Sequence, residues 1–218
     1  MLEKATEVGK YQHYHLLSGE DLPIQSQKTI QDFFMGQKDK EFVGIQQPDF
    51  RYGNRVYYRY FFQEKVGRKV NTLGKIQDKL LLLQRILGLK RNTDIAFQKG
   101  SNWFSITDEL ARYVLQKKDW IAKTFKYSCC ADEIFLQTIV LNSKFIGNLY
   151  YSGYDDPPKR TMRLVDWKRG NPYIFRMEDI DLIKKSSAFF ARKFDCDVDA
   201  NVIKEVGRLY SSKPQSQC

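Results

Sequence analysis

The segment over residues 131–141, ADEIFLQTIVL, constrains the fold of this chain more than any other part of the sequence. After two acids it is almost continuously apolar, and at helical spacing its large side chains cover more than one face. Such a helix is stable in water only when most of its surface is buried. We therefore expect a core helix over 131–141 with Asp132 and Glu133 in its first turn.

The residues alone leave the role of this acidic pair open. A carboxylate in the first turn of a helix is favoured by the helix dipole, which is a purely structural role. A rigid, buried helix can also hold a carboxylate at the rim of a cleft, where it would serve as a general base. Cys129 and Cys130 directly precede the pair. We expect these two thiols to pack or to form a turn, because the chain has no CxxC pair and its histidines lie far away.

Strands alternate with helices along the rest of the chain, which is the pattern of an α/β fold. We predict strands over 11–17 and 41–45, strand edges at 95–97 and 103–104, a β-rich stretch over 51–63, and a hairpin of 148–154 with 162–167. We predict helices over 26–35, 75–89, 107–117, 178–185 and 199–209. With 218 residues, 42% of them hydrophobic, we expect a single domain over 1–210 followed by a polar tail over 211–218.

The net charge of +10 favours an anionic partner, such as nucleic acid, an anionic membrane surface or a phosphate-bearing small molecule. Nucleic acid is not expected, because no RNP, KH, zinc-finger or helix-turn-helix pattern is present. The helix over 75–89 could lie on a membrane surface, since basic residues flank its leucines. We favour a buried core helix, because its apolar positions are not confined to one face. The irregular cysteine spacing indicates a reduced chain of the cytoplasmic type.

Several basic residues near the C-terminal end could meet on a diphosphate after folding: Lys168, Arg169, Arg192 and Lys193. A solvated basic face is the alternative. Three Asp-x-Asp strings, at 179–181, 195–197 and 197–199, are of the type that can hold a divalent ion on a nucleotide-sugar diphosphate. None of them follows a long apolar strand, so we do not expect a metal site there.

Five segments in order resemble the branching β-1,6-N-acetylglucosaminyltransferases and the related peptide O-xylosyltransferases, in particular their bacterial members. The segments are YQHYHLLSGEDLPIQSQKTIQDFF (11–34), GSNWFSITDELARYVL (100–115), ADEIFLQTIVLNS (131–143), MRLVDWKRG (162–170) and SSAFFARKFD (186–195). The resemblance implies a GT-A-like, Rossmann-like mixed sheet flanked by helices. It also implies inverting transfer of N-acetylglucosamine or xylose from a UDP-sugar to a hydroxyl of a glycan acceptor, with no metal and no other cofactor.

The same resemblance implies roles for individual residues. Glu133 corresponds to the general base, while Lys193 and Arg169 correspond to the cations that hold the UDP diphosphate. Acceptor-site positions are Trp167, Trp103 and Asp21.

Family members begin with further strands and helices that form much of the uridine pocket, so the resemblance implies an N-terminally truncated fold. A catalytically inactive fragment, or a basic binding module for glycan or nucleic acid, is therefore the alternative function. We expect a cytoplasmic location, at the inner face of the membrane if the chain makes peripheral membrane contact.

Overall fold

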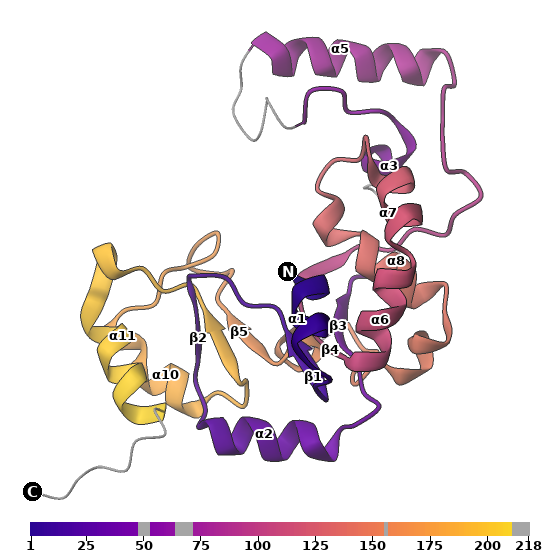
Figure 1. The fold of residues 1–218 in the computed structure, drawn as a ribbon. Helices are drawn as coiled ribbons and strands as arrows, with labels where there is room; N and C mark the ends of the chain where they lie inside the picture. The colour runs from indigo at the N-terminus through magenta and orange to yellow at the C-terminus, as the bar shows by residue number, and fades with distance from the viewer. Residues whose placement is uncertain (48–52, 64–71, 155–156, 211–218) are drawn as a thin grey trace, which may run out of the picture.

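The computed structural model describes residues 1–47, 53–63, 72–154 and 157–210. Two small three-stranded sheets lie side by side, and helices flank both of them (Figure 1). The expected mixed α/β fold with helices around the sheets is therefore confirmed. The GT-A-like topology and the truncation remain predictions.

The first sheet is antiparallel and has β4 (Gly100–Thr107) at its centre, between β1 (His13–His15) and β3 (Phe42–Ile45). The register shifts between Val43 and Ile45, next to Gly100. A Cβ atom at Gly100 would lie 1.6 Å from the carbonyl oxygen of Gly44, so only glycine allows the two strands to approach this closely.

The helix α8 (Phe135–Leu141) packs on the first sheet together with α6 (Asp108–Gln116). Leu136, Ile139 and Val140 are buried against Leu110, which confirms the expected core helix. Asp132 and Glu133, however, lie in a separate 3-10 turn, η1 (Ala131–Glu133), and not in the first turn of the helix. The two elements are separated because Ile134 adopts non-helical backbone angles and is fully buried beside α3 (Asn54–Tyr57).

Other elements surround this first layer. They are α1 (Leu2–Val8), α7 (Lys118–Phe125) and η2 (Lys144–Asn148). Thr107 caps α6 by accepting the backbone N–H of Leu110 at 3.2 Å, as expected for a threonine at this position.

The second sheet has β6 (Phe190–Arg192) at its centre, antiparallel to β2 (Asp21–Pro23) and parallel to β5 (Arg163–Val165). Its core is closed by η3 (Met177–Asp179), α10 (Ile180–Lys185) and α11 (Cys196–Tyr210). The helix α2 (Gln27–Gly36) begins after Ser26, whose side chain accepts the backbone N–H of Thr29. Phe34 of this helix packs with Phe42 of the first sheet and Phe190 of the second, so one aromatic cluster joins the two sheets.

The predicted hairpin is wrong. β5 pairs with β6, Leu149 forms an isolated bridge with Glu41, and α9 (Pro157–Thr161) lies between the two supposed strands. The stretch over 51–63 is not β-rich where it is described, because residues 54–57 form α3, and residues 51–52 lie outside the described ranges. No strand covers 95–97 in the described structure, since β4 begins at Gly100.

The prediction of a buried core helix over 75–89 is also wrong. The helix α5 (Thr72–Ile86) lies at the periphery of the molecule (Figure 1). It buries Gln77, Leu81 and Gln84, whereas Leu82 and Leu83 are exposed. None of the helices in the described ranges combines the length and the hydropathy that crossing a bilayer requires.

Candidate functional site

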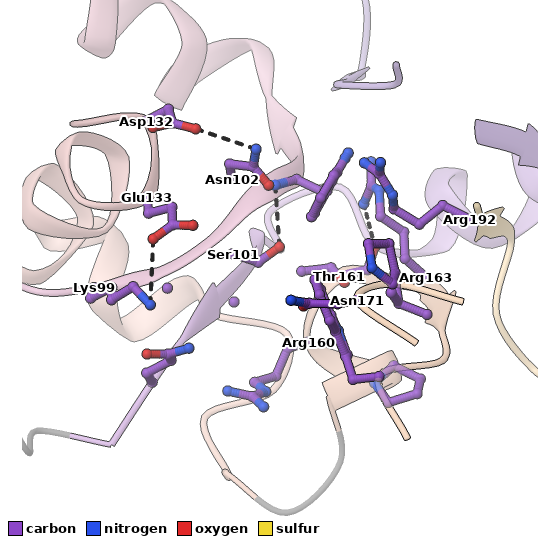
Figure 2. A pocket seen from close by; sticks show the side chains of 18 residues that line it. Lys99, Ser101, Asn102, Asp132, Glu133, Arg160, Thr161, Arg163, Asn171 and Arg192 are labelled. Atoms are coloured by element: carbon purple, nitrogen blue, oxygen red, sulfur yellow. Dashed lines mark hydrogen bonds and ion pairs between the residues drawn. The ribbon is translucent and has the colours of Figure 1, made fainter. Parts of the chain in front are cut away.

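A cavity of about 830 Å³ lies where the two sheets meet. Its walls come from β3, β4 and η1 of the first layer and from α9, β5, β6 and residues 171–172 of the second. This volume falls in the range typical of small-molecule sites. The lining is rich in charged side chains, and Figure 2 shows how the labelled residues face the cavity from both layers.

One end of the cavity carries Glu133. The Arg55 guanidinium donates to Glu133 Oε2 at 2.8 Å, and Lys99 Nζ lies 3.4 Å from the same oxygen. The Glu133 side chain is 31% exposed, so it is accessible from the cavity and not enclosed in the interior. Two cations on one oxygen fix the orientation of this carboxylate, which a general base requires.

Asp132 lines the same end but is more exposed than Glu133. Its Oδ2 accepts a long hydrogen bond from the side-chain amide of Asn102, at 3.4 Å (Figure 2). The two acids therefore have different surroundings, because in the described structure two cations hold Glu133, whereas an amide contacts Asp132. Cys129 and Cys130 precede the turn, and burial raises the pKa of the Cys129 thiol to about 11. A thiol with such a pKa is protonated at neutral pH, which agrees with a packing role.

Three arginines line the cavity: Arg163 and Arg192 lie across it from Glu133, and Arg160 lies apart from them, near the end of β3 (Figure 2). Arg163 is buried and donates to the carbonyl oxygens of Leu16 at 2.9 Å and Phe104 at 2.8 Å. Burial lowers its pKa to about 9, so it stays charged at neutral pH. Arg160 donates to the carbonyl oxygen of Ile45 at 2.6 Å. Within the described structure, the buried Nε atoms of Arg160, Arg163 and Arg192 make no hydrogen bond.

Arg192 connects two of the predicted acceptor-site residues. Its guanidinium lies 4.0 Å from the centre of the Trp103 ring, and its Nε lies 3.6 Å from Asp21 Oδ1. Glu20 Oε2 is 3.1 Å from its Nη2. Trp103 lines the cavity, whereas Asp21 is buried behind Arg192. Trp167 also lines the cavity and is largely exposed.

The two cations predicted for the diphosphate lie elsewhere. Arg169 is within 2.6 Å of both Asp166 and Asp179 and stacks on the Tyr173 ring at 4.0 Å. Lys193 Nζ lies 2.7 Å from Glu20 Oε1. In the described ranges, neither cation is among the residues that line the cavity. Of the six predicted site residues, the structure brings Glu133, Trp103 and Trp167 together around the cavity, and the roles of all six remain predictions.

The Asp-x-Asp strings take part in local structure. Asp179 accepts the backbone N–H of Arg176 at 2.9 Å, and Asp199 accepts the backbone N–H of Met177 at 2.8 Å. Asp195, Cys196 and Asp197 come close together at the start of α11, mostly exposed and away from the described cavity lining. An exposed acidic cluster of this kind is common at a helix N-terminus.

Sequence reasoning did not single out Lys99, Arg160 or Arg163, although all three line the cavity. One signal was present for Arg163, because it stands inside the apolar run MRLV, where an arginine is retained only with partners. Arg160 and Lys99 carry no comparable signal, since each lies in a polar, turn-rich segment.

Comparison with known proteins identifies a family. The family model described as Core-2/I-branching enzyme matches residues 1–185 of the chain. The match includes every residue that lines the cavity except Arg192. No curated protein matches the chain.

Proposed function

Because this chain belongs to the Core-2/I-branching enzyme family, we propose that its cavity transfers a sugar from a nucleotide-sugar donor to a hydroxyl of a glycan, with inversion at the anomeric carbon. Family membership implies a glycosyltransferase with a nucleotide-sugar donor and a glycan acceptor. UDP-N-acetylglucosamine or UDP-xylose is the proposed donor, on the resemblance of the sequence motifs.

The observation that carries the proposal is that a carboxylate and three arginines line one cavity. Glu133 stands at one end, Arg163 and Arg192 lie across the cavity from it, and Arg160 lines the cavity near the end of β3 (Figure 2). An inverting transfer needs a base on the acceptor side and positive charge on the leaving-group side. A cavity lined by both kinds of group fits this reaction.

In the proposed reaction, Glu133 takes the proton from the acceptor hydroxyl as that oxygen attacks the anomeric carbon of the donor sugar. The bond between that carbon and the diphosphate oxygen breaks, and UDP leaves with the bonding electrons. Fixed cations next to the diphosphate stabilise the negative charge that develops on it. Trp167 and Trp103 line the cavity and offer ring faces on which a sugar can stack.

We propose that the leaving diphosphate meets guanidinium groups and not a metal ion. Arg160 and Arg192 are the cavity-lining candidates, and Arg169 and Lys193 remain the candidates from sequence resemblance. Arg192, Arg169 and Lys193 would have to exchange their carboxylate partners for phosphate oxygens, because each is held in an ion pair. Turnover that is unchanged in EDTA would support this proposal, and turnover that depends fully on a divalent ion would contradict it.

The test of the base is Glu133→Gln, which keeps the size of the side chain and removes the carboxylate. We expect UDP release in the presence of donor and acceptor to fall by about 10²–10⁴-fold, while UDP binding is retained. Asp132→Asn is the matched control, because it neutralises the neighbouring acid at the same end of the cavity. Turnover near the wild-type rate in the Glu133 variant would show that the base is another group.

A binding module without catalysis is the second candidate. The observation that favours it is that Arg55 and Lys99 already contact Glu133, as in a structural ion pair. In that case the chain would bind a glycan or UDP without turnover, and Glu133→Gln would lower stability without a catalytic effect to measure. Salt-sensitive RNA binding with no response to UDP would favour the nucleic-acid form of this alternative.

A further inference from the structure

The helix α5 turns an apolar surface toward solvent. We call this surface the α5 leucine face; its residues are Ile76, Leu82, Leu83, Ile86, Leu87 and Leu89, each between 42% and 73% exposed. Within the helix, Leu83 follows Ile76 by seven residues, and Ile86 follows Leu82 by four and Leu83 by three, which places these members on one side. Several large apolar side chains exposed on one side of an element are typical of a contact site.

Hydrogen bonds fix the rotation of the helix about its axis. The buried Gln84 side chain accepts the backbone N–H of Arg59 at 2.8 Å and donates to the Arg59 carbonyl oxygen at 3.1 Å. Gln77, also buried, accepts the backbone N–H of Phe62 at 3.2 Å. Rotating the leucines inward would break these bonds and leave buried backbone groups without partners. The outward leucine face is therefore specified by the polar contacts on the other side.

Positive charge lies on and beside the leucine face, because Lys79 stands three residues after Ile76 and four before Leu83, on the same side of the helix. Lys75, Lys79, Arg85 and Lys90 are all exposed, and Asp78 is the only acid between residues 72 and 90. Arg85 lies over the Tyr58 ring at 5.9 Å, at the side of the helix. In Figure 1 the helix lies beyond α3 and α7, at the end of the molecule opposite α2.

We propose that α5 docks this protein on an anionic phospholipid bilayer. The leucine face enters the boundary between head groups and acyl chains, and the nearby lysines and arginine contact lipid phosphates. Helices that lie in the membrane interface combine an apolar side with basic residues. Anionic lipid complements these basic residues, whereas a second copy with the same cations would repel them. The proposal does not depend on the glycosyltransferase activity.

The test is co-sedimentation of the full chain with vesicles, either of phosphatidylcholine alone or of phosphatidylcholine mixed with phosphatidylserine. Wild type is expected to bind the mixed vesicles, and added salt is expected to weaken the binding. The double variant Leu83→Asp/Ile86→Asp is expected to bind at least about tenfold more weakly. Val8→Asp is the matched control, because Val8 is 79% exposed on α1, and it should bind as wild type does.

Charge is tested separately with Lys75→Glu/Lys79→Glu against Lys204→Glu, an exposed position on α11. We expect only the α5 pair to reduce binding strongly. An equal loss from Lys204→Glu would indicate general adsorption through net charge and would overturn the proposal. The proposal would also be overturned if the protein bound neither kind of vesicle but self-associated, and Leu83→Asp abolished the self-association. A second copy of the chain would then cover the leucine face.

Insertion of the leucine face into the bilayer is measured separately by tryptophan fluorescence. This measurement remains valid if an aspartate variant fails to fold. Leu83→Trp keeps a large apolar side chain at an exposed position. Its added fluorescence should be quenched by brominated acyl chains in mixed vesicles. Emission that is unchanged by brominated lipid, with the protein bound, would show that the leucine face stays in water and would contradict the proposal.

Discussion

Glu41 holds Thr107 by two hydrogen bonds at the junction of β4 and α6. Its carboxyl accepts the Thr107 backbone N–H at 3.0 Å and the Thr107 hydroxyl at 2.6 Å. The same hydroxyl oxygen caps α6, so Glu41 connects the beginning of β3 with the start of a core helix. Glu41 is fully buried, and burial raises its pKa to about 7.

This raised pKa predicts how the stability of the protein depends on pH. Unfolded Glu41 loses its proton near pH 4.5, while folded Glu41 keeps it until about pH 7. The favourable contribution is therefore complete below pH 4.5 and is lost as the pH rises through 7. The loss corresponds to about 3 kcal/mol, on the order of 1.4 kcal/mol for each unit of pKa.

Glu41→Gln removes this titration, because an amide stays neutral and can bond to Thr107 in a similar way. As the pH rises from about 4.5 to 7, we expect the unfolding free energy of wild type to fall relative to that of the variant. Urea unfolding of both proteins across that range measures it. Burial lowers the pKa values of His13 and His15, but both histidines are present in both proteins, so their contributions cancel. A difference that does not change with pH would contradict the assignment.

The contact of Gly100 with Gly44 makes a second prediction. Gly100→Ala places a Cβ atom 1.6 Å from a backbone oxygen and 2.8 Å from Gln137 Cγ, so the strands must separate. We expect a loss of about 1–3 kcal/mol in unfolding free energy. Gly207→Ala is the control, because it lies within α11 with nothing within 4 Å of its added Cβ, and it should be neutral or slightly stabilising. A Gly100 variant as stable as wild type would show that the strands can separate at little cost.

The sequence predicted best what depends on local chemistry. Ser26 and Thr107 cap helices as expected, and the apolar run after Glu133 is buried. Prediction from the sequence failed where the pairing partner of a strand or helix lies far away along the chain. β5 pairs with β6, more than 20 residues later, and no property of residues 162–167 identifies that partner. The leucines of α5 indicated a buried helix. The buried side of α5 instead carries glutamines, whose side chains hydrogen-bond to the backbone of Arg59 and Phe62.

The residues of the candidate site show the same difference between local features, which the sequence predicts, and features that depend on distant parts of the chain. Glu133 and the two tryptophans were reached through motifs, and all three line the cavity. Which of the 36 basic residues become buried on its wall depends on how the two sheets meet, and a single sequence does not encode that visibly. For this reason Arg160 and Arg163 emerged only from the structure.

The ion pair of Asp21 with Arg192 makes a third prediction. Both side chains are at most 10% exposed, and Asp21 also accepts the Ser18 backbone N–H at 2.6 Å. Arg192→Met would leave the buried Asp21 charge without its cation, at a cost of about 3 kcal/mol or more in unfolding free energy. Adding Asp21→Asn should recover part of that loss. Lys28→Met, which breaks an exposed pair with Asp32, should cost less than about 1 kcal/mol. Equal effects at the two sites would mean that the Asp21 charge is well solvated.

The last prediction concerns which cations meet the diphosphate. Arg160 lines the cavity, and its buried Nε makes no hydrogen bond within the described structure, whereas Arg169 and Lys193 are held by carboxylates. We expect Arg160→Ala to weaken UDP binding by about tenfold or more, as for the loss of a charge-assisted hydrogen bond. Isothermal titration with UDP measures the affinity, and Lys204→Ala provides an exposed control. A larger loss from Arg169→Ala or Lys193→Ala than from Arg160→Ala would place the diphosphate beside those residues, and their carboxylate partners would then have to release them when UDP binds.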